Sequence, residues 1–220
     1  MPNDRGAKYP LTDIACPDLT VVILTFNESL HIERCISSVQ DLASEIVVVD
    51  SGSTDETREI ATRMGARTLR HAWLNYASQL NWALEHGDIN TTWVMRLDAD
   101  EVVDTTLNAA LRRVLLTAEG DISGFEVRRY MVFLGQTIRH GGGVSPGRVL
   151  RVWRNGCAVC ENRWMDEHML LMGRSQLLEG ALVDHNLNSL TWWIQKHNVY
   201  ASREAVDLLN VQFGFLQYRS

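Results

Sequence analysis

Residues 92–101 read TWVMRLDADE, a short apolar run that ends in acidic residues. The run from Thr92 to Leu97 has the length and composition of a buried strand, and Asp98 and Asp100 follow it directly. If the chain turns after the strand, both carboxylates can face one cavity, where their hard oxygen atoms suit Mg²⁺ or Mn²⁺. The alternative is a solvated acidic turn that begins the next helix. The surrounding segments decide between these interpretations.

Two apolar, β-branched runs nearer the N-terminus predict further strands of the same sheet. They span Leu19 to Thr25 (LTVVILT) and Glu45 to Asp50 (EIVVVD). Strands that alternate with helical patterns predict an open α/β sheet with right-handed crossovers. In such sheets, ligands bind beyond the carboxyl ends of the strands. We therefore expect the polar segments 25–28, 50–55 and 98–101 to converge on one edge of the sheet.

The helical patterns between these strands carry start signals. Ser29 is a candidate cap for the helix that contains Ile32 and Ile36. Ser53 and Glu56 have capping-box spacing for the next helix. The remaining helices are expected at residues 76–86, beyond 104 and at 189–210, and the remaining strands at 67–70, 125–133, 148–154 and near 182.

Composition limits the class of protein. The chain has 220 residues, is 45% hydrophobic and carries a formal net charge of −6. It holds enough apolar material for one sizeable core, and its negative charge argues against a nucleic-acid partner. The sequence has no run of about 18 apolar residues, so it predicts no membrane span. Residues 1–18 are expected to be a polar leader without a signal core, which predicts a reduced, cytoplasmic protein.

Two of the four cysteines, Cys157 and Cys160, have the spacing of half a zinc site or of a redox pair. A structural zinc site needs four ligands, and the sequence has no second pair of this kind. The simpler interpretation is that they are two small, half-buried residues in a strand or loop.

Four segments of the first half resemble glycosyltransferase family 2, whose members are inverting enzymes of GT-A fold. The segments are TVVILTFNE, EIVVVDSGSTDET, YASQLNWAL and WVMRLDADE, and they cover about residues 19–104. Two later segments, WMDEHM and LVDHNLNSLTWWIQKHNVYAS, are similar to a subgroup that builds bacterial lipopolysaccharide core and related glycans. The resemblance implies an α/β fold of the GT-A nucleotide-diphospho-sugar transferase type. Its sheet would be open and mostly parallel, flanked by helices, with a smaller acceptor-facing β region and a C-terminal helix.

The resemblance also implies roles on the donor side. Asp50 would contact the uracil or ribose, although its residue type and position equally allow a helix cap or turn. The other residues implied around the nucleotide are Thr25, Asn27, Glu28, Gln79, Asn81 and Asp98.

By the same resemblance, Asp100 would be the direct ligand of Mn²⁺ or Mg²⁺, and Asp98 would lie near the ribose and the metal. His185 follows an apolar, strand-like run and would complete the metal or diphosphate site. A hydrogen-bonded structural histidine is equally consistent with the sequence. A cation on the diphosphate neutralises the charge that develops on the leaving group.

An inverting transfer needs a base that deprotonates the acceptor hydroxyl, and carboxylates usually serve. The family carries this base in an acidic motif of the second half, which here is Asp166-Glu167-His168. We expect Glu167 to be the base, with Asp166 as the alternative. The non-catalytic interpretation is a surface loop with adjacent acids.

These implications predict a metal-dependent inverting transferase that moves a hexose, with glucose as the first choice, from a UDP-sugar to a saccharide or lipid-linked acceptor. Residues 19–104 would form the nucleotide-sugar-binding half and 105–220 the acceptor-binding half of one domain. The family's processive members carry Q-x-x-R-W, and its absence here favours transfer of a single sugar. One alternative is a sugar nucleotidyltransferase, which normally has a Gly-rich phosphate loop that TFNESLHIERC lacks. The other is a non-catalytic nucleotide-sugar or glycan-binding module.

A local excess of basic residues in the second half could bind an anionic acceptor. Exposed strand arginines are the alternative. The excess comprises Arg128, Arg129, Arg139, His140, Arg148, Arg151 and Arg154. Because the acceptors of the subgroup are lipid-linked, peripheral contact with the cytoplasmic face of the inner membrane is compatible with the sequence.

Overall fold

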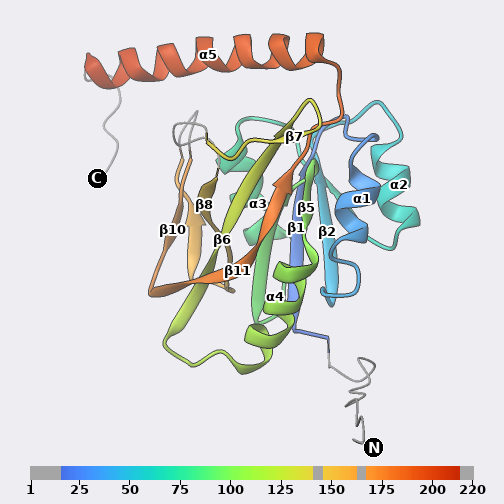
Figure 1. Cartoon of the computed structure of the whole chain (residues 1–220), viewed down its shortest axis with the longest axis vertical. Helices are drawn as coiled ribbons and strands as arrows, with labels where there is room; N and C mark the ends of the chain where they lie inside the picture. The colour runs from blue at the N-terminus through green and yellow to red at the C-terminus, as the bar shows by residue number, and fades with distance from the viewer. Residues whose placement is uncertain (1–15, 141–145, 163–166, 214–220) are drawn as a thin grey trace, which may run out of the picture.

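A computed structural model describes residues 16–140, 146–162 and 167–213 (Figure 1). Within these ranges the chain forms a nine-stranded sheet, a separate two-stranded sheet and five helices. In the described part of the chain, no helix is both long and apolar enough to cross a membrane.

The first half forms a parallel sheet with strand order β3-β2-β1-β4. Its strands are β1 (Leu19–Thr25), β2 (Glu45–Asp50), β3 (Arg67–Arg70) and β4 (Trp93–Asp98). The connecting helices are α1 (Ile32–Ser37), α2 (Thr57–Arg63) and α3 (Tyr76–His86). The register sets Thr25 beside Asp50 and Leu24 beside Asp98. The expected convergence of polar strand ends on one edge is therefore confirmed.

The second half extends the same sheet in the order β4-β8-β6-β11-β5, with antiparallel pairing except between β6 and β11. Its strands are β5 (Glu101–Val103), β6 (Ile122–Phe133), β7 (Gln136–Thr137), β8 (Gly147–Arg154), β9 (Ala158–Cys160), β10 (Met169–Leu171) and β11 (Arg174–Asp184). Its helices are α4 (Thr105–Thr117) and α5 (Leu190–Gln212). The expected α/β class is confirmed, but the sheet is parallel throughout only in its first half, because the second half pairs antiparallel except between β6 and β11.

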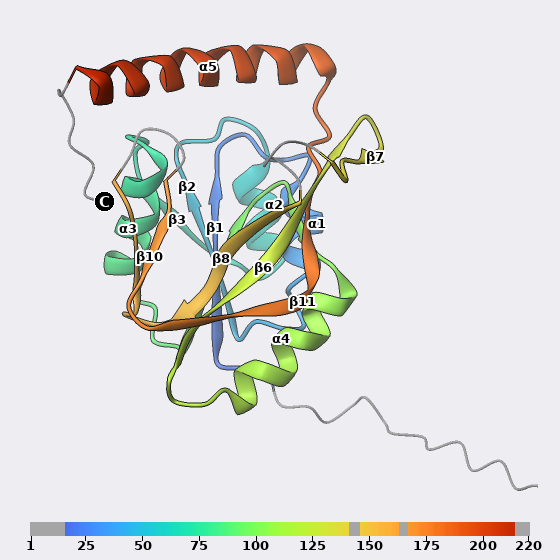
Figure 2. The ribbon, with the colours of Figure 1, turned by 60° about the vertical axis from the view of Figure 1, so that its left-hand side comes forward.

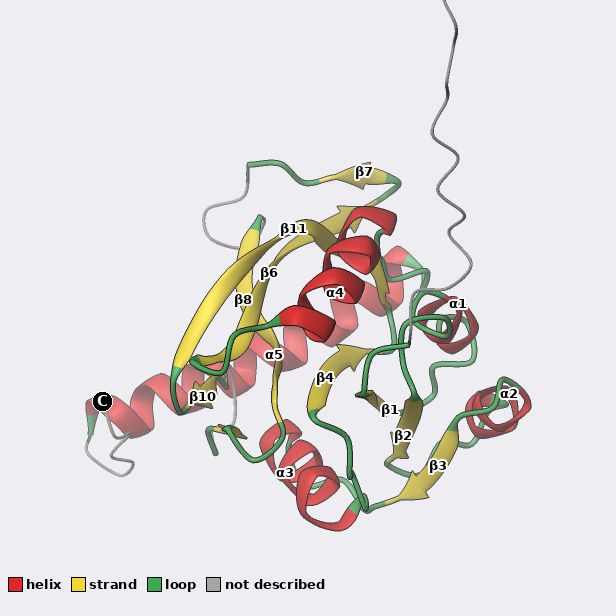
Figure 3. Cartoon of the chain, turned by 90° about the horizontal axis from the view of Figure 1, so that it is seen from below, coloured by secondary structure: helices red, strands yellow, loops and turns green. Residues whose placement is uncertain are grey.

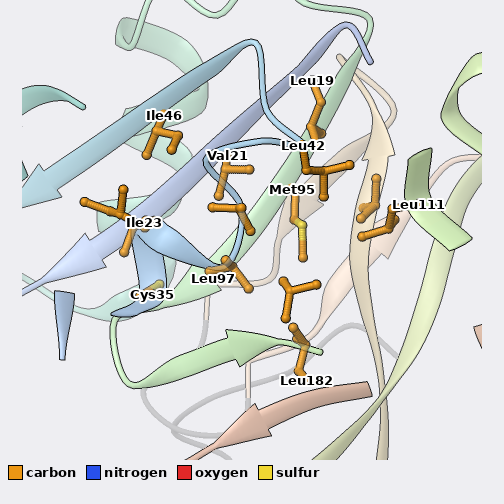
Figure 4. Packing of buried hydrophobic residues seen from close by; sticks show 14 of the residues in the cluster. Leu19, Val21, Ile23, Cys35, Leu42, Ile46, Met95, Leu97, Leu111 and Leu182 are labelled. Carbon is orange, nitrogen blue, oxygen red and sulfur yellow. The ribbon is translucent and has the colours of Figure 1, made fainter. Parts of the chain in front are cut away.

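The core lies on both faces of the sheet, because successive residues of a strand point to opposite sides. Val21 and Ile23 pack with α1, α2 and α4 on one face, together with Met95 and Leu97 of β4 (Figure 4). The intervening residues of β1 and β4 pack with α3 on the other face. Figure 3 shows α3 on the opposite side of these strands from α1. The central strands are thus buried on both sides, as their continuous apolar runs predict.

Helix α5 crosses the molecule above the edge where β1 and β2 end, as Figures 1 and 2 both show. Its first half contacts the body through Trp193, whose ring lies 4.9 Å from that of Phe133. Its second half leaves apolar side chains exposed, including Val206, Leu208 and Leu209.

Two predicted helix caps are wrong. Helix α1 begins at Ile32 after His31, which makes no side-chain cap bond, and Ser29 instead donates its backbone N–H to Asp55. Helix α2 begins after Glu56, again without a side-chain cap bond. The hydroxyl of Ser53 donates to the Asp50 carboxylate instead. A buried carboxylate at a strand end is a stronger acceptor than the competing local groups, so it decides the shape of this loop.

Candidate functional site

The loop after β2 is built around the carboxylate of Asp50, which is fully buried. Its Oδ1 accepts hydrogen bonds from the backbone N–H groups of Gly52 and Ser53, both at 3.0 Å. Its Oδ2 accepts from the hydroxyl groups of Thr25, at 3.3 Å, and of Ser53. Gly52 has a φ of +106°, which only glycine adopts without strain. Asp50 therefore shapes the loop from inside, and its contact with a uracil or ribose stays a prediction.

The loop after β1 is joined to the loop after β2. Asn27 accepts a 2.9 Å hydrogen bond from the Thr54 backbone N–H through its side-chain oxygen, and its own N–H donates to the Ser53 hydroxyl at 2.8 Å. The Glu28 N–H donates to the hydroxyl of Thr57 at 2.7 Å. Two of the predicted nucleotide-binding residues thus hold the two loops together on the expected edge.

The carboxylate of Glu28 extends this network to the second half. It lies 2.6 Å from Nδ1 of His31, a fully buried residue. The backbone N–H of Leu187 donates to Nε2 of the same ring at 2.8 Å. Because Nε2 accepts, the neutral ring carries its proton on Nδ1 and donates to Glu28. His31 therefore ties the segment after β11 to the first strand end.

Asp100 lies at the centre of this junction. Its Oδ2 accepts a 3.0 Å hydrogen bond from Asn186, and its carbonyl accepts from the backbone N–H of His185 at 3.1 Å. Arg34 donates to the carbonyls of both Asp100 and His185. Burial and the nearby charge of Arg34 lower the pKa of His185. The structure thus brings together Asp100 and His185, two of the three predicted metal residues.

Asp98, the third of them, is engaged from within the protein. The Tyr76 hydroxyl donates to its Oδ1 at 2.6 Å, and Arg151 approaches its Oδ2 at 3.4 Å. Nη2 of Arg96 lies 3.8 Å from the same oxygen. The side chain of Asp98 is 26% exposed. Burial alone would raise the pKa of Asp98, but the two guanidinium groups and the tyrosine hydrogen bond outweigh it and hold the pKa below its usual value. Asp98 is therefore ionised and compensated before any ligand binds.

Glu101 lies behind Asp98 and is fully buried. It accepts from the Asp98 backbone N–H at 3.1 Å and from Arg151 at 2.5 Å. Burial raises the pKa of Glu101 to about 7, opposed by the charge of Arg151 and increased by that of Asp98. Arg129 lies 3.9 Å from Glu101 and 3.6 Å from Asp184. Burial and the charge of Asp100 raise the pKa of Asp184 to about 6.

Sequence reasoning does not identify Tyr76, Arg96 or Asp184 as site residues. It includes Glu101 only in the polar segment 98–101, and it assigns Arg151 only to the basic excess. The usable signal is a charge inside an otherwise apolar strand, as in WVMRLD and RVLRVW. Such a charge predicts a buried partner, but the sequence does not say which one.

Gln79 and Asn81 hold α3 to its neighbours. The side-chain oxygen of Gln79 lies 2.8 Å from Nδ1 of His71, and its amide donates to the His71 carbonyl at 3.3 Å. The amide of Asn81 donates to the carbonyl of Cys160 and accepts from its N–H, both at 2.9 Å. These contacts occupy both side chains, and their role at the border of the donor site stays a prediction.

Of the predicted catalytic motif Asp166-Glu167-His168, the structure describes Glu167 and His168. Asp166 lies outside the described residues, and Glu167 is half-buried between β9 and β10. Burial raises the pKa of the Cys160 thiol to about 12, with Arg96 opposing and Glu167 adding to the effect. Because its charge acts on Cys160, Glu167 lies near the end of β9, where Cys160 hydrogen-bonds to Asn81.

Cys157 and Cys160 are free thiols, half-buried and buried respectively. Among the described residues, no group of three or more His, Cys, Asp and Glu side chains is arranged to hold a metal. Cys160 lies in β9 and Cys157 just before it, as the simpler interpretation of two small residues in a strand or loop expects.

Most cations of the basic excess have structural partners. Arg148 pairs with Glu126, and Arg154 donates to the carbonyls of Ile122 and Glu119 while stacking on Trp93. Arg129 and Arg151 pair with the buried acids, whereas Arg128, Arg139, His140 and Arg148 are exposed. Arg128 and Arg148 are cross-strand partners on β6 and β8, and an anionic acceptor stays a prediction for the exposed members of the excess.

Comparison with known sequences assigns the chain to a family. The model of glycosyl transferase family 2 matches residues 20–155. An uncharacterized glycosyltransferase of Rickettsia bellii is 32% identical over 215 residues, which cover 90% of this chain and 70% of the relative. A similar protein of Rickettsia typhi is 26% identical over 212 residues, covering 91% and 71%. A lipopolysaccharide core biosynthesis glycosyltransferase of Rhizobium meliloti is 35% identical over 145 residues, covering 63% and 51%.

Among solved structures, glucosyl-3-phosphoglycerate synthase from Mycobacterium tuberculosis, in complex with Mn²⁺, UDP and glucosyl-3-phosphoglycerate, overlaps in part. It is 27% identical, with a TM-score of 0.43, and the match covers 53% of this chain and 44% of that chain. This chain thus spans less than half the length of that protein. The family match, in contrast, covers more than half of the 220 residues. The chain therefore belongs to glycosyl transferase family 2 and is a glycosyltransferase.

Proposed function

We propose that this enzyme is a metal-dependent inverting glycosyltransferase that moves a hexose, glucose in the first instance, from a UDP-sugar to a saccharide or lipid-linked acceptor. The acceptor would belong to bacterial lipopolysaccharide or surface glycan. One observation carries the proposal: β1 and β4 are adjacent parallel strands that end level, with Leu24 beside Asp98 and Asp100 just beyond. Parallel α/β sheets bind ligands at this edge. The choice of UDP rests on the family resemblance.

Asp100 is the residue that would hold Mn²⁺ or Mg²⁺. Among the described residues, only Asn186 hydrogen-bonds its carboxylate, through Oδ2. Asp98 already engages both oxygens inside the protein, so its proposed contact is with the ribose. A site with few protein ligands suits these ions, which take the rest from water and substrate phosphates. When bound, the ion would neutralise charge on the leaving diphosphate.

On the acceptor side, Glu167 is proposed as the base that takes the proton of the attacking hydroxyl, with Asp166 as the alternative. Its proximity to Cys160 supports this role, because the charge of Glu167 acts on that thiol at the end of β9, and Cys160 packs with α3. The donor residues and Glu167 come from the two proposed halves, 19–104 and 105–220. The acceptor would bind between them.

A thermal-shift panel tests the donor side. UDP-, GDP- and dTDP-sugars are each added with and without Mn²⁺, because a ligand that binds the native state raises the melting temperature. We expect stabilisation by UDP-sugars that requires Mn²⁺ and disappears in Asp100→Asn. If no nucleotide stabilises the protein in the presence of Mn²⁺, the proposal is wrong.

Glu167→Gln tests the base. A general base typically contributes about 10² to 10⁴ in rate, so we expect turnover to fall within that range while UDP-sugar still binds. Glu179→Gln, an exposed position on β11, is the matched control. Unchanged turnover in Glu167→Gln would move the assignment to Asp166, which Asp166→Asn then tests.

A lipid-linked acceptor would bring the enzyme to the inner membrane face. The exposed apolar side chains of α5 support this part of the proposal, since Val206, Leu208 and Leu209 are each more than half exposed. Co-sedimentation with phosphatidylethanolamine–phosphatidylglycerol vesicles tests it, and Val206→Ser/Leu209→Ser should abolish binding. Equal sedimentation of both proteins would exclude α5 as the contact.

A further inference from the structure

We propose that Glu101 and Arg151 are positioning residues that hold the carboxylate of Asp98 in place on the donor edge. The inference rests on the proposed function, in which Asp98 contacts the donor. Neither Glu101 nor Arg151 would touch the ligand, and both would act through Asp98.

The three residues form a closed set of contacts. Glu101 accepts from the Asp98 backbone N–H through Oε2, at 3.1 Å, and from Arg151 Nη2 through Oε1, at 2.5 Å. The same Nη2 lies 3.4 Å from Oδ2 of Asp98. Both the backbone and the side chain of Asp98 are thus held by the pair. Tyr76 completes the set by donating to Oδ1.

The pair lies inside the protein, where water screens charge weakly. Glu101 is 0% exposed and Arg151 is 2% exposed. Within the described part of the chain, Nε and Nη1 of Arg151 have no hydrogen-bond partner, so the contacts of Nη2 orient the guanidinium. Buried ion pairs add little net stability compared with apolar residues of similar volume. A role in placing the Asp98 carboxylate therefore accounts for the buried Glu101–Arg151 pair better than a contribution to stability does.

The contacts join elements that the chain brings together only by folding. Asp98 ends β4, Glu101 begins β5, and Arg151 lies on β8, the antiparallel neighbour of β4. Met95 of β4 pairs with Val152, so Arg151 reaches the end of β4 from the side. The turn that carries Asp100 lies between Asp98 and Glu101 in sequence. Fixing Asp98 and Glu101 therefore also fixes the two ends of this turn.

The variants must separate placement from folding. Arg151→Met alone leaves a buried carboxylate without its partner and is expected to destabilise the protein. The double variant Glu101→Gln/Arg151→Met removes both charges and retains an acceptor for the Asp98 N–H. Its matched control is Glu45→Gln/Arg67→Met, which removes a 2.8 Å ion pair between β2 and β3. Near-UV circular dichroism and melting temperature confirm folding of each protein.

The experiment measures UDP affinity by calorimetry at saturating Mn²⁺, with and without Asp98→Asn. If the pair acts through Asp98, the double variant weakens UDP binding about tenfold in the wild-type background and less than twofold in Asp98→Asn, because contacting residues do not act additively. The control pair should change affinity less than twofold. Equal losses in both backgrounds, or no loss in the wild-type background, would overturn the inference. A wild-type protein that binds no UDP instead contradicts the proposed function.

Discussion

The side-chain amide of Asn186 donates a 3.0 Å hydrogen bond to Oδ2 of Asp100, which joins the segment after β11 to the acidic turn after β4. The two residues are far apart in sequence, and Arg34 reinforces their junction by donating to the Asp100 and His185 carbonyls. A hydrogen bond of this kind orients a carboxylate that is expected to bind a metal.

Removal of this hydrogen bond should weaken the proposed metal site. Loss of an outer partner of a metal ligand typically costs 10- to 100-fold in metal affinity or activity. For Asn186→Ala we expect Mn²⁺ affinity in the presence of UDP to fall about tenfold, measured by activity against Mn²⁺ concentration. Asn198→Ala, an exposed position on α5, is the control. Equal Mn²⁺ dependence in both variants would show that Asn186 does not support the site.

The two aspartates of the acidic turn should respond differently to loss of charge. Asp100→Asn is expected to lower kcat/KM at least about 100-fold with little change in melting temperature, because its carboxylate has few internal partners. Asp98→Asn should also lower the melting temperature, because Arg151 and Arg96 lose part of their compensation inside the protein. An unsatisfied buried charged group costs about 1–3 kcal/mol or more. Calorimetric scans of both variants without ligand would contradict this if Asp98→Asn melted no lower than Asp100→Asn.

The contact between α3 and β9 should contribute measurably to stability. Asn81→Ala removes two hydrogen bonds and leaves the N–H and carbonyl of Cys160 without their partner. We expect a loss of about 2 kcal/mol in the free energy of unfolding. Urea denaturation measures this loss, with Asn90→Ala, in an exposed loop, as the control. A change below about 0.5 kcal/mol would mean that the contact is not formed in solution.

The four thiols should divide into two classes. Burial raises the pKa of Cys160 to about 12 and that of Cys35 well above its usual value, so both remain protonated and enclosed at pH 8. The thiolate is the reactive form. Iodoacetamide at pH 8, followed by mass spectrometry, should therefore label exposed Cys16 and half-buried Cys157 before the other two. Equal labelling of Cys157 and Cys160 in the folded protein would contradict the buried position of Cys160.

The sheet and its binding edge could be predicted because their causes are local. LTVVILT, EIVVVD and WVMRLD are continuous apolar runs, and only a strand with both faces covered buries all of their side chains. Parallel connection through helices then places their carboxyl ends at one edge. The helix caps failed for the opposite reason. The local sequence allowed Ser53 to cap the helix, but its hydroxyl donates a hydrogen bond to the buried Asp50 carboxylate instead.

The sequence by itself therefore determined the α/β class, the family and the edge that carries Thr25, Asp50 and Asp98. Only the tertiary structure decided how the acids of that edge are compensated. The charge of Asp98 is compensated by Arg151, from a strand about fifty residues later. The carboxylate of Asp100 accepts a hydrogen bond from Asn186, which lies beyond β11. The physical reason is that apolar periodicity reports burial, whereas the partner of a buried charge is chosen by strand register and by the distance between atoms.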